Sequence, residues 1–161
     1  MNESIRDYQP SDCDPVVALS LRAWAPVFGS MEQVVGSEIF VRLHGDWRQY
    51  QAKAVREVLA DEATHAWVAE DDAGVTGFVA ATFFDPERKL GEIVMLAVDP
   101  DHQQHGLGTA LTEFATDWLR DAGMLVAMIG TGGDPGHAPA RRVYEKADYT
   151  LIPLARYFKA L

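Results

Sequence analysis

A polar turn that contains two glycines, Gln103 to Thr109, directly follows an apolar run and precedes a helical pattern. The N-terminus of a helix carries unpaired backbone N–H groups and a partial positive charge. Glycines at positions 106 and 108 would let an anion approach these groups, because a Cβ at either place would crowd it. The turn has no lysine or arginine, so backbone amides and the helix dipole would do most of the binding. The alternative is that the turn only connects two elements, and both interpretations stay open.

The sequence gives little support for other common kinds of reactive site. The glycine spacing matches neither GxGxxG nor a phosphate loop with GK[ST], although another diphosphate, such as that of coenzyme A, remains compatible with it. The five histidines form no HExxH or Cys–His cluster, so no metal is predicted. No GxSxG motif appears, and the lone Cys13 is interpreted as an ordinary residue near a helix start.

Length and charge narrow the class of protein. With 161 residues, the chain predicts one domain over residues 1–161 that can bury a core. The net charge of −10 argues against general nucleic-acid binding, which needs a basic face. It mildly favours a cationic substrate such as an amine, although solubility alone would explain it. No long apolar run and no secretory pattern occur, so we expect no membrane association and a cytoplasmic location.

The first part of the chain predicts mainly helices. Apolar residues recur at helical spacing after good capping residues. The expected elements are a short strand over 4–8, a helix from Asp12 that Pro26 and Gly29 interrupt, a second helix over 31–43, and a third over 47–59 capped by Asp46.

From His65 onward the pattern changes to strands. A hairpin is expected over 65–84, followed by two nearly continuous apolar strands that flank a strongly amphipathic helix. Strand, helix and strand with a long crossover imply a right-handed parallel unit. The later expected elements are strands over 90–98 and 125–130, the helix over 107–119 that Gly123 ends, a helix over 139–146, and two short strands over 150–152 and 156–161.

Four segments resemble, in the right order, the GNAT N-acetyltransferase superfamily. The turn Q103-x-x-G106-x-G108 resembles the family's [Q/R]-x-x-G-x-[G/A] signature. The hairpin WVAEDDAGVTGFVA, the strand exit LAVDPDHQ and the segment ARRVYEKADY are also similar to the family's elements. The resemblance covers about residues 65 to 161 and is weak over the first 60.

The resemblance implies an α/β fold with N-terminal helices on a mixed, mostly antiparallel sheet. Its fourth and fifth strands, here 90–98 and 125–130, splay apart as a parallel pair, and acetyl-CoA, the acyl donor, lies between them. No metal takes part. The residues that the resemblance places against this cofactor are Leu96, Ala97, Val98, Gln103, Gln104, His105, Gly106, Leu107, Gly108, Thr109, His137 and Tyr144.

The resemblance also implies direct transfer of an acetyl group to an amine, with three catalytic groups. Tyr144 stands at the family's tyrosine and is the candidate acid, unless it only packs on the sheet. Glu92 is the candidate base, directly or through water, because EIVMLAV resembles the histone-acetylating branch; a solvated strand end is the alternative. The backbone N–H of Leu96 would polarise the thioester carbonyl. Many relatives have asparagine where this chain has His137, which leaves that cofactor contact open.

The acceptor is expected to be a small-molecule or peptide amine. Its pocket would come from the first helices and the C-terminal strands, and Trp24, Phe28 and Tyr157 could line it, whereas Trp47 is interpreted as core. The resemblance is compatible with a homodimer. Two other functions stay open: a catalytically silent acyl-CoA sensor, and an unrelated α/β protein whose glycine turn is only a connector.

Overall fold

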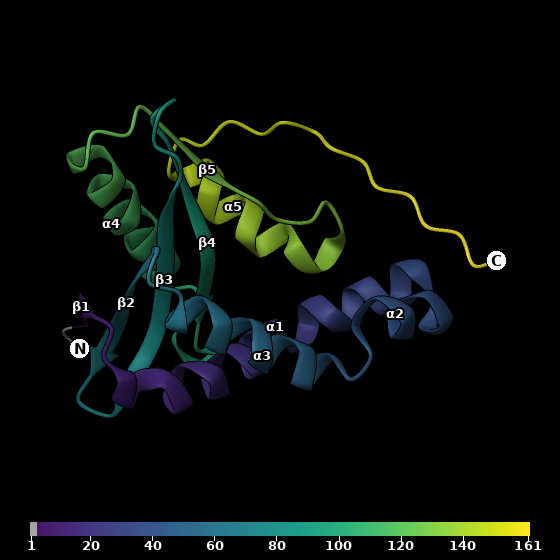
Figure 1. Ribbon diagram of the computed structural model, residues 1–161. Coiled ribbons are helices and arrows are strands. Elements are labelled where there is room, and N and C mark those ends of the chain that lie inside the picture. The colour runs from purple at the N-terminus through teal and green to yellow at the C-terminus, as the bar shows by residue number, and fades with distance from the viewer. Residues whose placement is uncertain (1–2) are drawn as a thin grey trace.

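The computed structural model describes residues 3 to 161 and contains one five-stranded sheet in the order β1-β2-β3-β4-β5 (Figure 1). The strands are β1 (Ser4–Asp7), β2 (Thr64–Asp71), β3 (Gly74–Asp85), β4 (Leu90–Val98) and β5 (Val126–Ile129). Neighbouring strands are antiparallel except β4 and β5, which are parallel. The α-helices are α1 (Cys13–Val35), α2 (Ser37–His44), α3 (Trp47–Ala60), α4 (Leu107–Asp121) and α5 (Ala138–Lys146), with short 3₁₀ helices η1 (Pro10–Asp12), η2 (Pro100–His102) and η3 (Pro135–His137).

Helices cover both faces of the sheet. On one face, α1 and α3 pack through Val16, Leu19 and Val55 against Phe78 of β3. On the other face, α4 packs through a second cluster of apolar residues: Val79, Ile93, Leu111, Ala115 and Leu119. Because successive residues of a strand face opposite sides, two covered faces explain the continuous apolar runs in the sequence.

A β-bulge in β4 lies directly after the last residue of β4 that pairs with β5. Ala80 of β3 pairs with Met95, whereas the next residue, Ala81, pairs with Ile93, which leaves Val94 as an extra residue. Such a bulge bends the strand. The parallel pairing of β5 with β4 ends at Ile93, so the second half of β4 continues without β5 beside it. The expected splayed parallel pair is therefore confirmed.

The predicted interruption of the first helix is wrong. The helix α1 continues through Pro26 to Val35 and ends at Gly36, whose φ is +83°. A proline inside a helix removes a hydrogen bond and costs about 3 kcal/mol. Contacts on both sides of the proline oppose this cost, since Phe28 is buried and stacks on Trp47 with ring centroids 4.7 Å apart. The predicted cap of α3 is confirmed, because Asp46 accepts a hydrogen bond from the N–H of Arg48.

The two short strands predicted at the C-terminal end are also wrong. Within residues 3–161 no strand follows β5, and residues 150 to 161 are exposed along their whole length. Tyr149 is the last residue for which a backbone hydrogen bond is found in this part of the chain; its N–H donates to Tyr144. A strand needs a partner for its backbone groups, and this segment reaches none.

We expect Asp12→Asn to lower the free energy of unfolding at pH 7 by about 1 to 3 kcal/mol. Arg6 donates to both carboxylate oxygens of Asp12, at 2.8 and 3.0 Å, and the carboxylate is almost fully buried. Hydrogen bonds from Arg6 hold the pKa of Asp12 below its ordinary value, although burial acts in the opposite direction. Because the folded-state pKa is the lower one, the stabilisation is complete above about pH 4, the unfolded pKa, and is lost as the pH falls through the folded pKa.

Urea unfolding at pH 7 and pH 3 measures this effect. The difference between the wild type and Asp12→Asn should shrink at pH 3. Asp14→Asn is the matched control, because Asp14 pairs with Arg56 at the exposed surface and should matter little. An equal loss of stability in wild type and Asp12→Asn between the two pH values would contradict the role of Asp12.

Candidate active site

The glycine turn reverses the chain between β4 and α4 through two left-handed residues. The φ angles of Gln104 and Gly106 are +66° and +88°. A Cβ added at Gly106 would meet no protein atom within 4 Å, and one at Gly108 would lie 3.5 Å from Val143, an ordinary contact. The space beside Gly106 is therefore open, as a ligand in close approach would require, whereas the corresponding side of Gly108 faces Val143 on α5 and not open space.

The backbone N–H groups of this turn lack protein acceptors. The first hydrogen bond of α4 runs from the N–H of Ala110 to Gly106. Within residues 3–161 no acceptor is found for the N–H groups from Gln104 to Thr109. Gln104, His105 and Gly106 are exposed. The turn thus presents a row of free donors at the positive end of a helix dipole, which is an arrangement that binds anions.

Several side chains fix the turn against the rest of the protein. Leu107 is buried in the core beside α4. The side-chain amide of Gln103 donates to the carbonyl of Val98 at 3.0 Å, so this part of Gln103 holds the exit of β4. The turn is therefore rigidly placed with respect to the strand that precedes it.

A charged cluster that sequence reasoning missed supports the same turn. The buried Asp99 follows β4, accepts a hydrogen bond from the N–H of Asp101, and pairs with Arg22 of α1. His102 lies 3.1 Å from the carboxylate of Asp71 at the end of β2. The signal available in the sequence was Asp99 directly before Pro100, a pattern typical of a helix cap.

The second half of β4 lies where β5 no longer pairs with it. Leu96, Ala97 and Val98 pair on one side with β3, and no pairing with β5 is found beyond Ile93. Their contact with a cofactor stays a prediction. An extended ligand beside these residues could use backbone groups that would otherwise pair with a neighbouring strand.

Tyr144 lies on α5, directly after Val143, whose side chain faces Gly108 at the start of α4. Burial raises the pKa of the Tyr144 phenol to about 12, with a smaller contribution from Tyr149. The phenol therefore keeps its proton across the neutral range. No side-chain hydrogen bond of Tyr144 is found within the described part of the chain, residues 3–161, so the hydroxyl has no internal partner that it must give up.

Glu92 is half-buried and lies on the opposite face of the sheet from α4. Its neighbours Gly91 and Ile93 both face α4, since a Cβ on Gly91 would touch Leu119 and Ile93 belongs to the core there. Glu92 therefore points to the side of α1 and α3. It pairs with Met128, one residue before the β4–β5 pairing ends. Glu92 thus lies on the side of α1 and α3, close to the place where β4 and β5 stop pairing, whereas Tyr144 lies on α5.

The glycine-rich loop after β5 is fastened to α1 by Asp134, another residue that sequence reasoning missed. One carboxylate oxygen accepts from the hydroxyl of Ser30 at 2.6 Å and from the N–H of Gly136 at 3.2 Å. The same N–H also donates to the hydroxyl oxygen of Ser30 at 2.9 Å, so Asp134 holds both partners of Gly136 in place. The other carboxylate oxygen is hydrogen-bonded to the Nδ1 atom of His137. Burial raises the pKa of Asp134, but hydrogen bonds from Ser30 and His137 outweigh it and the net shift is downward. His137 is thus held in one orientation by its Nδ1 atom.

We expect Asp134→Asn to accelerate amide exchange of Gly136 at least tenfold. The carboxylate accepts three hydrogen bonds, and asparagine has only one acceptor oxygen and two donor hydrogens. Hydrogen exchange of the loop measures the change. Asp148→Asn is the matched control at the far end of α5, because asparagine tolerates the positive φ of this residue. Unchanged protection of Gly136 in Asp134→Asn would contradict this role.

Of the three residues predicted to line the acceptor pocket, Trp24 and Phe28 lie one helical turn apart on α1, whereas Tyr157 lies in the segment after α5. Trp24 is half-buried on α1, edge-on to Phe78, on the same face as Glu92. Phe28 is buried and packs among Phe40, His44 and Trp47, so it presents little surface to an acceptor. Tyr157 is 92% exposed in the segment after α5 and touches neither of the other two rings. The interpretation of Trp47 as core agrees with its stacking on Phe28.

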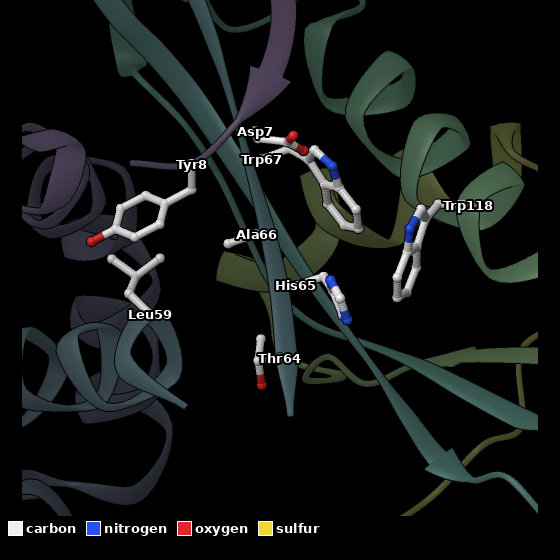
Figure 2. Close-up of a pocket in the computed structure, with 8 residues that line it drawn as sticks. All are labelled: Asp7, Tyr8, Leu59, Thr64, His65, Ala66, Trp67 and Trp118. Carbon is white, nitrogen blue, oxygen red and sulfur yellow. The ribbon is translucent and has the colours of Figure 1, made fainter. Parts of the chain in front are cut away.

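A pocket of about 390 Å³ lies at the edge of β2 (Figure 2). None of the three residues predicted to line the acceptor pocket contributes to it. Tyr8 and Leu59 lie on one side of the strand, and His65, Trp67 and Trp118 lie on the other. The rings of Trp67 and Trp118 contact each other, with centroids 5.0 Å apart. Neither the glycine turn, Glu92 nor Tyr144 contributes to the lining of this pocket.

Comparison with known proteins decides the family. The model of the acetyltransferase (GNAT) family matches residues 33–149. The chain belongs to the GNAT acetyltransferase family. The match includes the glycine turn and Tyr144, and it begins within α1, earlier than the resemblance in the sequence suggested.

Curated relatives of this GNAT chain carry the name mycothiol acetyltransferase. The protein from Sanguibacter keddieii is 31% identical over 154 residues, which cover 91% of this chain and 43% of the relative. The protein from Beutenbergia cavernae is 36% identical over 86 residues, which cover 53% of this chain and 28% of the relative. The chain thus spans less than half the length of these relatives.

Solved structures share the GNAT fold with this chain. A GNAT-family protein from Desulfovibrio desulfuricans is similar with a TM-score of 0.68 and 22% identity, over 91% of this chain and 83% of the other. An N-acetyltransferase from Thermoplasma acidophilum, solved in complex with coenzyme A, gives a TM-score of 0.64 and 13% identity, over 91% and 89% of the two chains. These similarities support the mixed sheet with a parallel β4–β5 pair.

Within residues 3–161 no helix combines the length and apolar composition needed to cross a bilayer. Over the same range, no three His, Cys, Asp or Glu side chains come close enough together to share a metal ion.

Proposed function

We propose that this chain is an N-acetyltransferase that moves an acetyl group from acetyl-CoA to the primary amine of a small molecule or peptide. The observation that carries the proposal is the row of N–H groups from Gln104 to Thr109 without protein acceptors, placed where β4 parts from β5. Membership of the GNAT family and coenzyme A in a structural neighbour support it.

The glycine turn would hold the diphosphate of the cofactor. The donors of the turn are backbone groups, so they need no reorganisation before they bind an anion. Open space at Gly106 leaves room for close approach. The free side of Leu96 to Val98 would accept the extended arm of the cofactor. His137 would lie near this arm, where Asp134 fixes its orientation.

The chemistry needs one proton removed and one proton supplied. When bound, acetyl-CoA supplies the acetyl group as a thioester. A bond forms between the amine nitrogen and the acetyl carbon, and the carbon–sulfur bond breaks. A proton must leave the nitrogen, because an ammonium has no lone pair, and a proton must reach the sulfur. The N–H of Leu96 would stabilise the negative charge that develops on oxygen.

Glu92 and Tyr144 would divide the two proton transfers. Glu92 faces α1, on the side where the half-buried Trp24 also lies, so we assign it to the acceptor amine. Tyr144 lies on the helix that faces Gly108, so we assign it to the sulfur. A phenol with a raised pKa stays neutral and can donate a hydrogen bond or a proton. Burial would also raise the pKa of the coenzyme A thiol beside Tyr144. The pKa values of the phenol and the thiol would therefore stay close enough for a proton to pass to the sulfur.

We expect Glu92→Gln to lower kcat about 100-fold at pH 7, since glutamine cannot accept a proton from the amine. Steady-state kinetics over pH 6 to 10 measure the effect. The loss should diminish at high pH, where more of the amine is already neutral. Glu87→Gln, on the exposed turn between β3 and β4, is the control. A loss of activity that is the same at every pH would indicate that Glu92 acts only structurally.

Thiol release from acetyl-CoA tests the proposed function itself. The panel of amines should include the substrate classes that the names of structural neighbours mention, such as aminoglycosides and a peptide that begins with alanine. We expect saturable, amine-dependent thiol release. Binding of acetyl-CoA without turnover on any amine would instead favour a silent acyl-CoA sensor. Absence of binding would overturn both.

A further inference from the structure

Helix α1 is fastened to the chain segments that follow β4 and β5, the two strands that separate. Arg22 pairs with the buried Asp99 directly after β4. The hydroxyl of Ser30 donates to Asp134 in the loop after β5 and accepts from the N–H of Gly136 at 2.9 Å. Ser30 follows Arg22 by eight positions, which is about 12 Å along a helix. The stretch of α1 between these contacts therefore bridges the exits of the two strands.

Four apolar side chains on the α1 side of the sheet are only half-buried: Trp24, Val94, Met95 and Met128. The first three pack against the core cluster beneath α1 and α3, and Trp24 lies between the two fastening points of α1. Met128 faces the same side, because its neighbours Ala127 and Ile129 pack on the α4 side. Apolar surface that the fold leaves uncovered on this side can be buried by a ligand.

Glu92 brings a single free charge to this side of the sheet. It is the only charged residue of β4, and it pairs with Met128 across the two strands. Within residues 3–161 no hydrogen bond or ion pair engages its carboxylate. The other carboxylates at the exits of β4 and β5, Asp99 and Asp134, already have partners, and α1 has no acidic residue between positions 22 and 30. These segments thus offer one uncommitted carboxylate among half-buried apolar side chains.

This arrangement matches an amine that has one positive charge and an apolar body. The ammonium group would pair with Glu92, and the body would cover Trp24 and Met95. A second ammonium group would find no uncommitted carboxylate on these segments, and an unpaired charge is costly to take out of water. The general excess of acidic residues, 24 against 14 basic ones, attracts cations to the whole surface but supplies no second partner here.

We propose, on the basis of the acetyl transfer proposed above, that the acceptor is a primary monoamine with an apolar body that lies against Trp24 and Met95. Its nitrogen would give a proton to Glu92 and then form the bond to the acetyl carbon, while the carbon–sulfur bond breaks.

Two amines with the same carbon chain test the number of charges. Hexylamine has one amino group, and 1,6-diaminohexane has a second one at the far end. We expect kcat/KM, measured by thiol release from acetyl-CoA, to be at least about tenfold higher for hexylamine, although the diamine has two groups that can react. An equal or higher kcat/KM for the diamine would overturn the proposed class of acceptor and leave the proposed acetyl transfer intact.

A second carboxylate on the same side should shift this preference. Met95 lies three positions after Glu92, no more than about 10 Å along the strand. Met95→Glu should raise kcat/KM for 1,6-diaminohexane relative to hexylamine about tenfold. Val41→Glu adds the same charge at a 56% exposed position of α2 and is the matched control. The same shift in both variants would mean that overall charge, and not this side of the sheet, selects the amine.

Trp24→Leu tests the apolar body separately and introduces no charge. We expect KM for hexylamine to rise about tenfold and kcat to stay within about twofold. For methylamine, which has no body that could reach Trp24, both quantities should stay nearly unchanged. An equal rise of KM for the two amines would show that Trp24 does not contact the acceptor body.

Amine binding without turnover separates this proposal from the proposed function. We would label the methionine methyl groups and titrate hexylamine with and without coenzyme A. The NMR signals of Met95 and Met128 should shift, whereas that of Met124, which packs on the α4 side, should not. Such shifts without thiol release would sink the acetyl transfer and keep the amine site. Absence of shifts at Met95 and Met128 would overturn the site, even if hexylamine is acetylated.

Discussion

Replacement of Tyr144 by phenylalanine is expected to lower kcat about 100-fold or more, while the Kd for coenzyme A stays within about twofold. The change removes a single oxygen from a side chain that makes no internal hydrogen bond within the described residues. The loss should therefore fall on proton delivery to the departing sulfur rather than on folding. Steady-state kinetics with the best amine, together with calorimetric titration of coenzyme A, measure the two quantities separately.

Tyr149→Phe is the matched control for this experiment. Tyr149 lies beside Tyr144, with ring centroids 6.5 Å apart, and its hydroxyl is paired with Thr116. Its loss should lower stability, because the hydroxyl joins the end of α5 to α4, and it should leave kcat nearly unchanged. If Tyr144→Phe keeps full activity, or if both variants lose activity equally, Tyr144 is not the acid.

Replacement of Gly106 by alanine is expected to weaken coenzyme A binding at least tenfold. The residue has a φ of +88°, and a Cβ there would project into open space above the free N–H groups. The methyl group would thus meet the diphosphate rather than protein. In addition, the left-handed conformation costs an alanine about 1 to 2 kcal/mol, which would favour a rearranged turn with misaligned donors.

Gly123 gives a close control at the other end of the same helix. Its φ is +90°, and a Cβ there also meets no protein atom within 4 Å. Gly123→Ala should therefore lose about as much stability as Gly106→Ala, by thermal unfolding, and should bind coenzyme A normally. Equal affinities of the two variants for coenzyme A would show that Gly106 only allows the chain to turn and does not leave room for the cofactor.

The sequence predicted best those features that depend on local pattern. The cap at Asp46, the strand–turn–helix around Gly106 and the end of α4 before Gly123 each follow from a few adjacent residues. The parallel pair of β4 and β5 followed from the length of the crossover and the resemblance. These elements position the proposed cofactor site, which is why that part of the site was accessible from the sequence.

Features that depend on distant residues were missed. Pro26 stays inside α1, where the contact that opposes its cost joins Phe28 to Trp47 of α3. The hydrogen bond between Ser30 and Asp134 joins residues 104 positions apart, so no local pattern in the sequence predicts it. The predicted strands after residue 150 were wrong for a similar reason: a strand depends on an edge beside it, and no local pattern shows whether the chain reaches such an edge.

The extra residue in β4 has a consequence for the proposed cofactor site. Val94 and Met95 both face the helices α1 and α3, so the bulge resets which residues of β4 point to each side. Deleting Val94 would restore regular alternation and let β5 hydrogen-bond further along its neighbour. In the proposed cofactor site, a single inserted amino acid would thus mark where the space for a thioester between the two strands begins.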